Sequence, residues 1–213
     1  MPARVGRRPH RPGGRTGSRQ RHSDPRHQAL RDLLRLLRRD HSEVGGVARL
    51  VPRIRSNIVA VYIVRPAPSG DGVELLMLQR PDDHRFAGAW QTVGGHIEER
   101  QGETAWQAAL RELDEETALP VERWFRIDRP ETFYNPENDT IYFVPAFVAL
   151  VAADAEPTLS DEHQACRWQS PQEAASSVDW AAMRDSIRLV GEAYSDSQQP
   201  GLGVTEFDPE RLR

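Results

Sequence analysis

The segment Gly94-Gly95-His96-Ile97-Glu98-Glu99-Arg100-Gln101-Gly102-Glu103 decides the fold, together with Arg111-Glu112-Leu113-Asp114-Glu115-Glu116-Thr117-Ala118-Leu119, which follows seven residues later. Good helix formers with a narrow apolar stripe predict a helix over residues 104–113 and beyond. On that helix Glu112, Glu115 and Glu116 stand at i, i+3 and i+4, so three carboxylates share one face.

This acidic face has two interpretations. Like charges one turn apart repel, and each such pair destabilises a helix by about 0.2–0.5 kcal/mol. A hard divalent cation turns the repulsion into attraction, because Mg²⁺ takes oxygen ligands from carboxylates, water and substrate phosphates. From the carboxylates alone, a solvated helix face is favoured over a metal site.

The surrounding spacing resembles the signature of the Nudix hydrolase family. That signature is a glycine, five residues, a glutamate, seven residues, and then Arg-Glu-apolar-x-Glu-Glu-x-Gly-apolar. Here seven residues separate Gly95 from Glu103, and the Arg-Glu-x-x-Glu-Glu core begins at Arg111. The resemblance implies an α/β/α sandwich around a mixed sheet.

The chain departs from the signature twice. Two extra residues, Arg100 and Gln101, lengthen the loop before Gly102. Ala118 stands where a glycine in left-handed conformation is usual. Alanine is destabilised in that conformation by roughly 1 kcal/mol, so either the helix ends at this strained position or it runs on and stops before Pro120.

The resemblance implies hydrolysis of a nucleoside diphosphate linked to another group, with attack of water on a phosphorus. The implied cofactor is Mg²⁺, with Mn²⁺ as the alternative; the cation neutralises phosphate charge and helps activate the water. The metal ligands implied by position are Glu112, Glu115, Glu116 and the Gly95 carbonyl. Arg111 and Glu103 are implied to form an ion pair that keeps helix and loop in register.

A second resemblance, patchy over residues 58–190, is to bacterial dihydroneopterin triphosphate pyrophosphatases, also called dATP pyrophosphohydrolases. The runs that carry it are Leu76-Met77-Leu78-Gln79-Arg80, Trp90-Gln91-Thr92-Val93 and Glu162-His163-Gln164-Ala165-Cys166-Arg167-Trp168. It implies that Glu162 is a further metal ligand and a base, and that Arg80 contacts substrate. Gly94 replaces the threonine of that family.

Each of these residues has a second interpretation. Glu162 is either a metal ligand or an exposed loop acid. Arg80 either offers its planar fork to phosphate oxygens or makes a surface ion pair. Trp90 either stacks on a base or fills the core. His96 and His163 we interpret as loop or supporting histidines, because carboxylates already supply the base.

The rest of the chain predicts an α/β domain with a mixed sheet. Residues 58–64 are a continuous apolar run, which predicts a strand buried on both faces. Further strands are expected at 73–80, 121–128, 131–134, 140–151 and 165–169. Pro145 should place its strand at an edge or a bulge. Helices are expected after Ser170 and over residues 179–194.

Four regions are predicted: a disordered basic tail (1–22), a helix and linker (23–53), the Nudix domain (54–195) and a loose C-terminal tail (196–213). Residues 1–55 carry 15 arginines and 4 acidic residues, a net charge of +11. Residues 56–213 carry 13 arginines and 28 acidic residues, a net charge of −15. We interpret the tail as an extension without function, against a nucleic-acid-binding tail or an organellar transit peptide.

The chain has one cysteine, Cys166, which fits a reducing compartment and is interpreted as inert packing. No run approaches eighteen apolar residues and no secretory signal is recognisable, so a cytoplasmic protein without a membrane partner is expected.

The sequence therefore predicts a Mg²⁺-dependent pyrophosphohydrolase. Its partner would be a small molecule, a (deoxy)nucleoside triphosphate or dihydroneopterin triphosphate, cut to a monophosphate and pyrophosphate. Alternative substrates are nucleotide sugars and dinucleoside polyphosphates. An alternative of another class is a non-catalytic nucleotide sensor whose basic tail binds nucleic acid. The sequence does not predict the oligomeric state.

Overall fold

The computed structural model describes residues 51–83, 86–195, 200–201 and 203–212. The part of the chain from Arg49 to Arg213 forms one compact unit by its internal contacts. The predicted basic tail, residues 1–22, and the predicted helix after it lie outside the described residues. Within the described part, no helix is long and apolar enough to cross a membrane.

A mixed sheet forms the centre of this unit. Its strands, in spatial order, are β10 (Ala165–Gln169), β3 (Val73–Gln79), β2 (Ile58–Pro66), β9 (Ala146–Val151), β6 (Val121–Ile127) and β11 (Val204–Phe207). Strands β2 and β9 are parallel, and the other neighbours are antiparallel. Two short strands join it, β4 (Trp90–Gln91) on β3 and β5 (Val93–His96) on β2. The predicted mixed sheet is confirmed.

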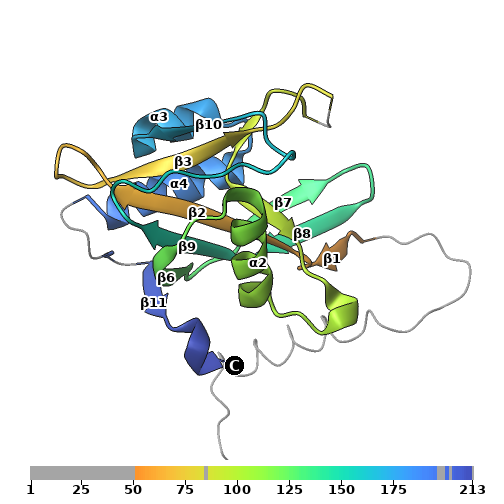
Figure 1. The fold of residues 1–213 in the computed structure, drawn as a ribbon. Helices are drawn as coiled ribbons and strands as arrows, with labels where there is room; N and C mark the ends of the chain where they lie inside the picture. The colour runs from red at the N-terminus through yellow and green to blue at the C-terminus, as the bar shows by residue number, and fades with distance from the viewer. Residues whose placement is uncertain (1–50, 84–85, 196–199, 202, 213) are drawn as a thin grey trace, which may run out of the picture. The chain divides into compact units, whose positions relative to one another are not determined.

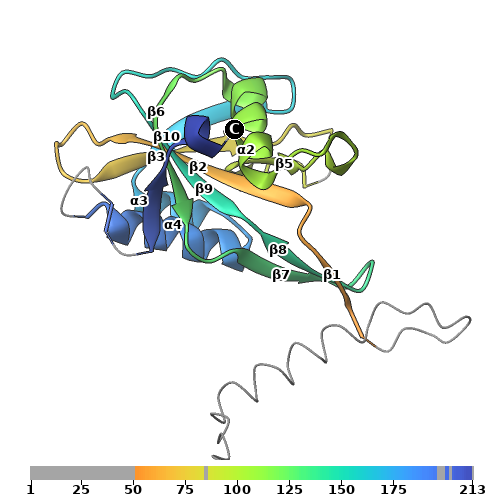
Figure 2. The same ribbon diagram turned by 90° about the horizontal axis from the view of Figure 1, so that it is seen from below.

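Helices cover both faces of the sheet (Figures 1 and 2). Figure 2 shows α2 (Ala105–Thr117) on one face, and α3 (Pro171–Ser177) with α4 (Ala181–Ala193) on the other. The buried residues form two clusters, one under α2 and one under α3 and α4. The α/β/α sandwich is thus present, and the sheet separates its two cores.

Local sequence explains where the helices begin. Thr104 accepts a hydrogen bond from the Gln107 N–H, and the Gln107 side chain accepts one from the Thr104 N–H, which is a capping box. Ser170 and Glu173 form the same arrangement at α3. These caps satisfy backbone donors that a helix start otherwise leaves unpaired.

A smaller sheet extends from the sandwich. It consists of β1 (Arg53–Arg55), β8 (Thr140–Val144) and β7 (Glu131–Asn135), in that order. The expected interruption of residues 140–151 at Pro145 is confirmed, but it is a passage between two sheets and not an edge or a bulge. Pro145 lies between β8 in the small sheet and β9, which is buried at the centre of the large sheet. The missing proline N–H therefore falls where the chain leaves one sheet for the other.

The end of α2 decides between the two expectations for Ala118. The helix ends at Thr117, and Ala118 takes a left-handed conformation with φ of 51°. Its N–H donates to the Asp114 carbonyl at 2.9 Å. The helix therefore ends where the family's glycine would end it, with an alanine in a conformation that alanine disfavours.

The C-terminal segment is more ordered than expected. Strand β11 pairs antiparallel with β6, and Val204 is buried. The Arg123 guanidinium of β6 contacts the Glu206 carboxylate of β11 at 2.6 Å. A short 3₁₀ helix, η3 (Pro209–Leu212), follows. The prediction of a loose tail is wrong for these residues, because β11 pairs with β6 and its end residues, Val204 and Phe207, pack against the two cores.

Candidate active site

Strand β5 passes directly beside the acidic face of α2. A Cβ atom on Gly95 would lie 2.0 Å from the Cδ and Oε1 atoms of Glu112, so the carboxylate occupies the space that a side chain would need. A Cβ on Gly94 would lie 2.9 Å from the Val59 carbonyl oxygen. Both glycines are therefore required by close approach, and the threonine expected at Gly94 would not fit without a shift of the strand.

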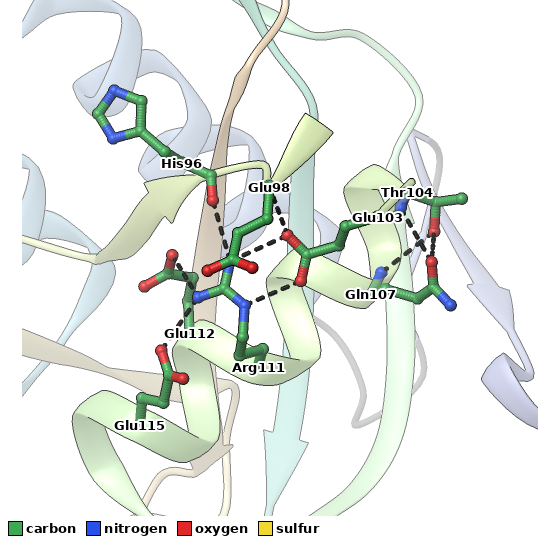
Figure 3. Close-up of polar contacts among 8 residues, drawn as sticks. All are labelled: His96, Glu98, Glu103, Thr104, Gln107, Arg111, Glu112 and Glu115. Carbon is green, nitrogen blue, oxygen red and sulfur yellow. Dashed lines mark hydrogen bonds and ion pairs between the residues drawn. The ribbon is translucent and has the colours of Figure 1, made fainter. Parts of the chain in front are cut away.

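Arg111 links the helix to the strand and to the preceding loop (Figure 3). Its guanidinium makes a bidentate contact with Glu103, Nε to Oε1 at 2.8 Å and Nη2 to Oε2 at 3.0 Å. Nη1 donates to Glu112 at 2.8 Å and to Glu115 at 3.0 Å, and Nη2 donates to the His96 carbonyl at 2.9 Å. The expected ion pair between Arg111 and Glu103 is present, and it is one arm of a larger network.

The two-residue insertion is absorbed in a turn. Arg100 and Gln101 lie in the 3₁₀ helix η2 (Glu99–Gln101), which ends at Gly102 with φ of 73°. Glu103 still reaches Arg111, and its other hydrogen bond is from the Glu98 N–H at 2.8 Å. Hydrogen bonds from Arg111 lower the pKa of the Glu103 carboxyl, so Glu103 stays ionised.

Glu116 is the buried member of the three carboxylates. Its side chain is 2% exposed, and Oε1 accepts a hydrogen bond from the Gly94 N–H at 3.3 Å. Burial and the negative charges of Glu112 and Glu162 raise the pKa of Glu116, the Gly94 N–H and the Arg80 charge lower it, and the net pKa is about 8. Burial likewise raises the pKa of Glu112.

His163 stands behind Glu116. Its Nε2 lies 3.6 Å from Oε2 of Glu116 and 3.2 Å from the Gln91 amide nitrogen. Burial, followed by the charge of Arg80, lowers the pKa of His163 to about 4, so the imidazole is neutral at pH 7. This position suits a supporting histidine better than a charged partner of Glu116.

Two observations fit the site to a hard divalent cation. Oε2 of Glu116 is buried without a hydrogen-bond partner in the described part of the chain, although a buried acceptor normally has one. Gly95 lacks the Cβ that would displace Glu112, which keeps a second carboxylate close to the strand. As they stand, no three His, Cys, Asp or Glu side chains among the described residues are grouped closely enough for a metal. Glu112 and Glu115 are instead turned towards Arg111.

A cavity of about 680 Å³ lies beside β5, and although Glu112, Glu115 and Glu116 do not line it, two of its lining residues act on Glu116. Gly94 and Arg80 line it, and both act on Glu116, one through its N–H and the other through its charge. Aromatic side chains line the remainder: Phe86 and Trp180, which pack edge to face at 5.4 Å between centroids, and Phe133 and Tyr142, which stack at 5.0 Å.

Sequence reasoning missed most of this lining. Phe86 comes from the loop before β4, Trp180 from the start of α4, and the other pair from β7 and β8. Nothing in local spacing relates these segments. The one available signal is Trp180, which lies at the start of the helix expected over residues 179–194.

The remaining predicted residues lie as follows. Trp90 does not line the cavity: it packs beside the core under α3 and α4, with the Arg167 guanidinium 3.7 Å from its ring centroid. Glu162 is exposed, near enough for its charge to raise the pKa of Glu112 and Glu116. Arg80 is half-buried and donates to the Gln91 side chain at 3.3 Å.

Comparison with known proteins agrees with this geometry. The model of the NUDIX domain matches residues 56–190. A nucleoside triphosphatase NudI from Escherichia fergusonii is 30% identical over 136 residues, covering 61% of this chain and 95% of that protein. The NudI of Salmonella arizonae is 31% identical over the same length and coverage.

Solved structures of the same family are similar. The C. elegans Ap4A hydrolase binary complex is 27% identical with a TM-score of 0.52, covering 63% of this chain and 93% of that one. The E. coli dihydroneopterin triphosphate pyrophosphohydrolase is 25% identical with a TM-score of 0.52, covering 66% and 96%. Because the family model matches well over half of the chain, including every residue that builds this site, the chain belongs to the NUDIX family and is a Nudix hydrolase.

Proposed function

We propose that this enzyme cuts a nucleoside triphosphate into a nucleoside monophosphate and pyrophosphate. One observation carries the proposal: an aromatic-lined cavity of about 680 Å³ meets a cluster of carboxylates at Gly94 and Arg80. Such a volume suits a nucleoside, since small-molecule sites are commonly about 300–1,000 Å³. The similar NudI proteins, named nucleoside triphosphatases, support the same substrate class.

Glu112 and Glu116 would hold a Mg²⁺ ion, with Glu162 and the Gly95 carbonyl as further oxygen donors. When bound, the cation supplies charge neutralisation at the phosphates and lowers the pKa of a coordinated water. Mn²⁺ would fit the same oxygen donors. The partnerless Oε2 of buried Glu116 supports this assignment, because a cation would satisfy it.

Arg111 acts on the site through Glu112. Its Nη1 fixes Oε1 of Glu112 at 2.8 Å, and its bidentate contact with Glu103 fixes the guanidinium itself. The bond from Nη2 to the His96 carbonyl ties both to β5. These contacts position the carboxylate in advance, so that little reorganisation is needed when phosphate arrives.

Within the cavity the substrate would be held by charge beside Glu116 and by stacking on the aromatic side chains. Arg80 lines the cavity beside Glu116, and its planar fork can bind phosphate oxygens. Phe86, Trp180, Phe133 and Tyr142 offer aromatic faces and edges to a base. Stacking of a base on an aromatic side chain contributes about 1–3 kcal/mol.

The proposal is tested by incubating the protein with Mg²⁺ and a panel of nucleoside triphosphates, nucleotide sugars and dinucleoside polyphosphates. We expect pyrophosphate and a monophosphate from triphosphates, and near-complete loss of turnover in Glu116→Gln. Glu122→Gln, at an exposed residue of β6, is the matched control and should retain activity. Turnover confined to nucleotide sugars or dinucleoside polyphosphates would move the substrate class, and normal turnover by Glu116→Gln would refute the site.

A further inference from the structure

The cavity contains one carboxylate that the proposed hydrolysis does not use. Glu131, the first residue of β7, lines the cavity away from the acidic face of α2. Its Oε1 accepts a hydrogen bond from the Tyr62 hydroxyl of β2, and the Ser186 hydroxyl of α4 also bonds to it. Three elements therefore fix the orientation of this carboxylate.

A purely structural role does not account for its position. Tyr62 is fully buried and Ser186 is 4% exposed, whereas Glu131 keeps contact with the cavity. A carboxylate has about four lone-pair sites, of which Tyr62 and Ser186 use one each. About two acceptor sites of the carboxylate therefore remain for a ligand in the cavity.

The surroundings of Glu131 are apolar and aromatic. Phe133 and Tyr142 follow on the same face of the small sheet, because Glu131 pairs with Val144 and Phe133 with Tyr142. Met183 and Trp180 of the α4 region line the cavity as well. A base stacked on these side chains would meet a fixed, acceptor-only group at its edge.

We propose that Glu131 selects a base carrying two adjacent N–H donors, the ring N–H and exocyclic amine of a 2-amino-4-oxopyrimidine edge. Guanine and pterin share this edge, and its two donors match the two carboxylate oxygens. Adenine and cytosine place a ring acceptor beside their amine, and uracil and thymine place two carbonyls beside their N–H. Each of those edges would face one carboxylate oxygen with a lone pair.

The inference rests on the proposed function and names the substrate class of the same cavity. Burial raises the pKa of Glu131, while the hydrogen bonds from Tyr62 and Ser186 and the charge of Arg129 favour the ionised, acceptor-only carboxylate. The measurements are repeated over a series of pH values, because recognition by the ionised carboxylate should strengthen as the pH rises.

The test compares kcat/KM for dGTP, dITP, dATP and dihydroneopterin triphosphate in the wild type and in two variants. Glu131→Gln keeps the shape of the side chain but replaces one acceptor with a donor. Tyr62→Phe removes a partner of Glu131 and leaves the carboxylate. A bidentate base contact commonly discriminates by about 5- to 150-fold, so the dGTP to dATP ratio should fall by that factor in Glu131→Gln and by less than about threefold in Tyr62→Phe.

Comparing dGTP with dihydroneopterin triphosphate distinguishes guanine from pterin as the recognised group. Faster turnover of dGTP than of the pterin triphosphate assigns the edge to guanine, and the reverse order assigns it to pterin. dITP lacks the amine, so the wild type should turn it over more slowly than dGTP. Glu131→Gln should not show this difference. A wild-type preference for dATP, or a dGTP to dATP ratio unchanged in Glu131→Gln, would overturn the inference while leaving the hydrolase intact.

Binding decides the matter if no triphosphate is hydrolysed. Dissociation constants for the α,β-imido analogues of dGTP and dATP are measured with the wild type and Glu131→Gln, without reliance on turnover. Tighter binding of the guanine analogue that is lost in Glu131→Gln supports the recognition even if the proposed reaction fails. Equal binding of both analogues by the wild type rejects it.

Discussion

Replacing Gly95 with alanine adds one methyl group at the closest approach of β5 and α2. The new Cβ would lie 2.0 Å from Cδ and Oε1 of Glu112 and 2.3 Å from its Oε2. Non-bonded carbon atoms approach to about 3.5–4.0 Å. The Glu112 carboxylate must therefore move by about 1.5 Å, which breaks its 2.8 Å contact with Arg111.

The two consequences of this shift differ in size. Glu112 is the end of a flexible side chain and Arg111 keeps Glu103, so the free energy of unfolding should fall by only about 1–2 kcal/mol, within the range of a lost charge-assisted hydrogen bond. Catalysis should suffer more, because a misplacement of about 1 Å in a reacting group can lower the rate by about 100-fold. We therefore expect a folded protein with kcat reduced by about two orders of magnitude.

The assay measures kcat by pyrophosphate release and the free energy of unfolding by urea titration. Gly201→Ala is the control, since its Cβ would make an ordinary contact with the Ala193 carbonyl oxygen at 3.5 Å. A kcat of Gly95→Ala within threefold of the wild type would refute the argument that Glu112 needs this space. If Gly95→Ala loses activity because the whole protein unfolds, the argument that the substitution affects catalysis more than stability is refuted.

Three further predictions concern the same unit. Ala118→Gly should raise the free energy of unfolding by about 0.5–1 kcal/mol, because glycine adopts the φ of 51° without a Cβ clash; an unchanged urea midpoint would contradict this. In chelator, stability should fall by about 2 kcal/mol between pH 6.5 and 8, because folded Glu116, with its pKa of about 8, holds a proton that the unfolded chain releases near pH 4.5. The pKa of His163, about 4, makes stability rise with pH, but only below about pH 6.5. In urea titrations at each pH, Glu116→Gln should remove the fall of stability with pH. A fall that survives the substitution would argue against Glu116 as its source. Glu103→Gln should lower kcat by about 10- to 100-fold through a loosened Arg111, and wild-type steady-state kinetics would show that the bidentate contact does not matter.

The elements that carry local periodicity were predictable from the sequence. The buried run of β2, the helix start at Ser170 and the spacing of Glu112 and Glu116 each depend on residues within a short stretch of chain. So was the pair of Arg111 with Glu103, because the family resemblance fixes that position. These features depend on contacts between near neighbours, which spacing encodes.

The cavity was not predictable in the same way. Glu131, Phe86 and Trp180 come from segments up to about 90 residues apart, and only the complete fold brings them together. For Trp90, which stands next to the family motif, the sequence left base stacking and core packing open, and its ring packs against Arg167 and the core. The spacing of residues along one helix or strand does not predict which distant helix or strand those residues will contact.

Pro145 divides the molecule into parts that can accumulate mutations at different rates. Before it, β7 and β8 line the aromatic part of the cavity; after it, β9 is buried on every residue between β2 and β6. A change in the hairpin would alter the lining of the cavity, whereas a change in β9 would disturb the core. The shape and polarity of the cavity can therefore change while the helix that carries the acidic face and the sheet behind it keep their packing.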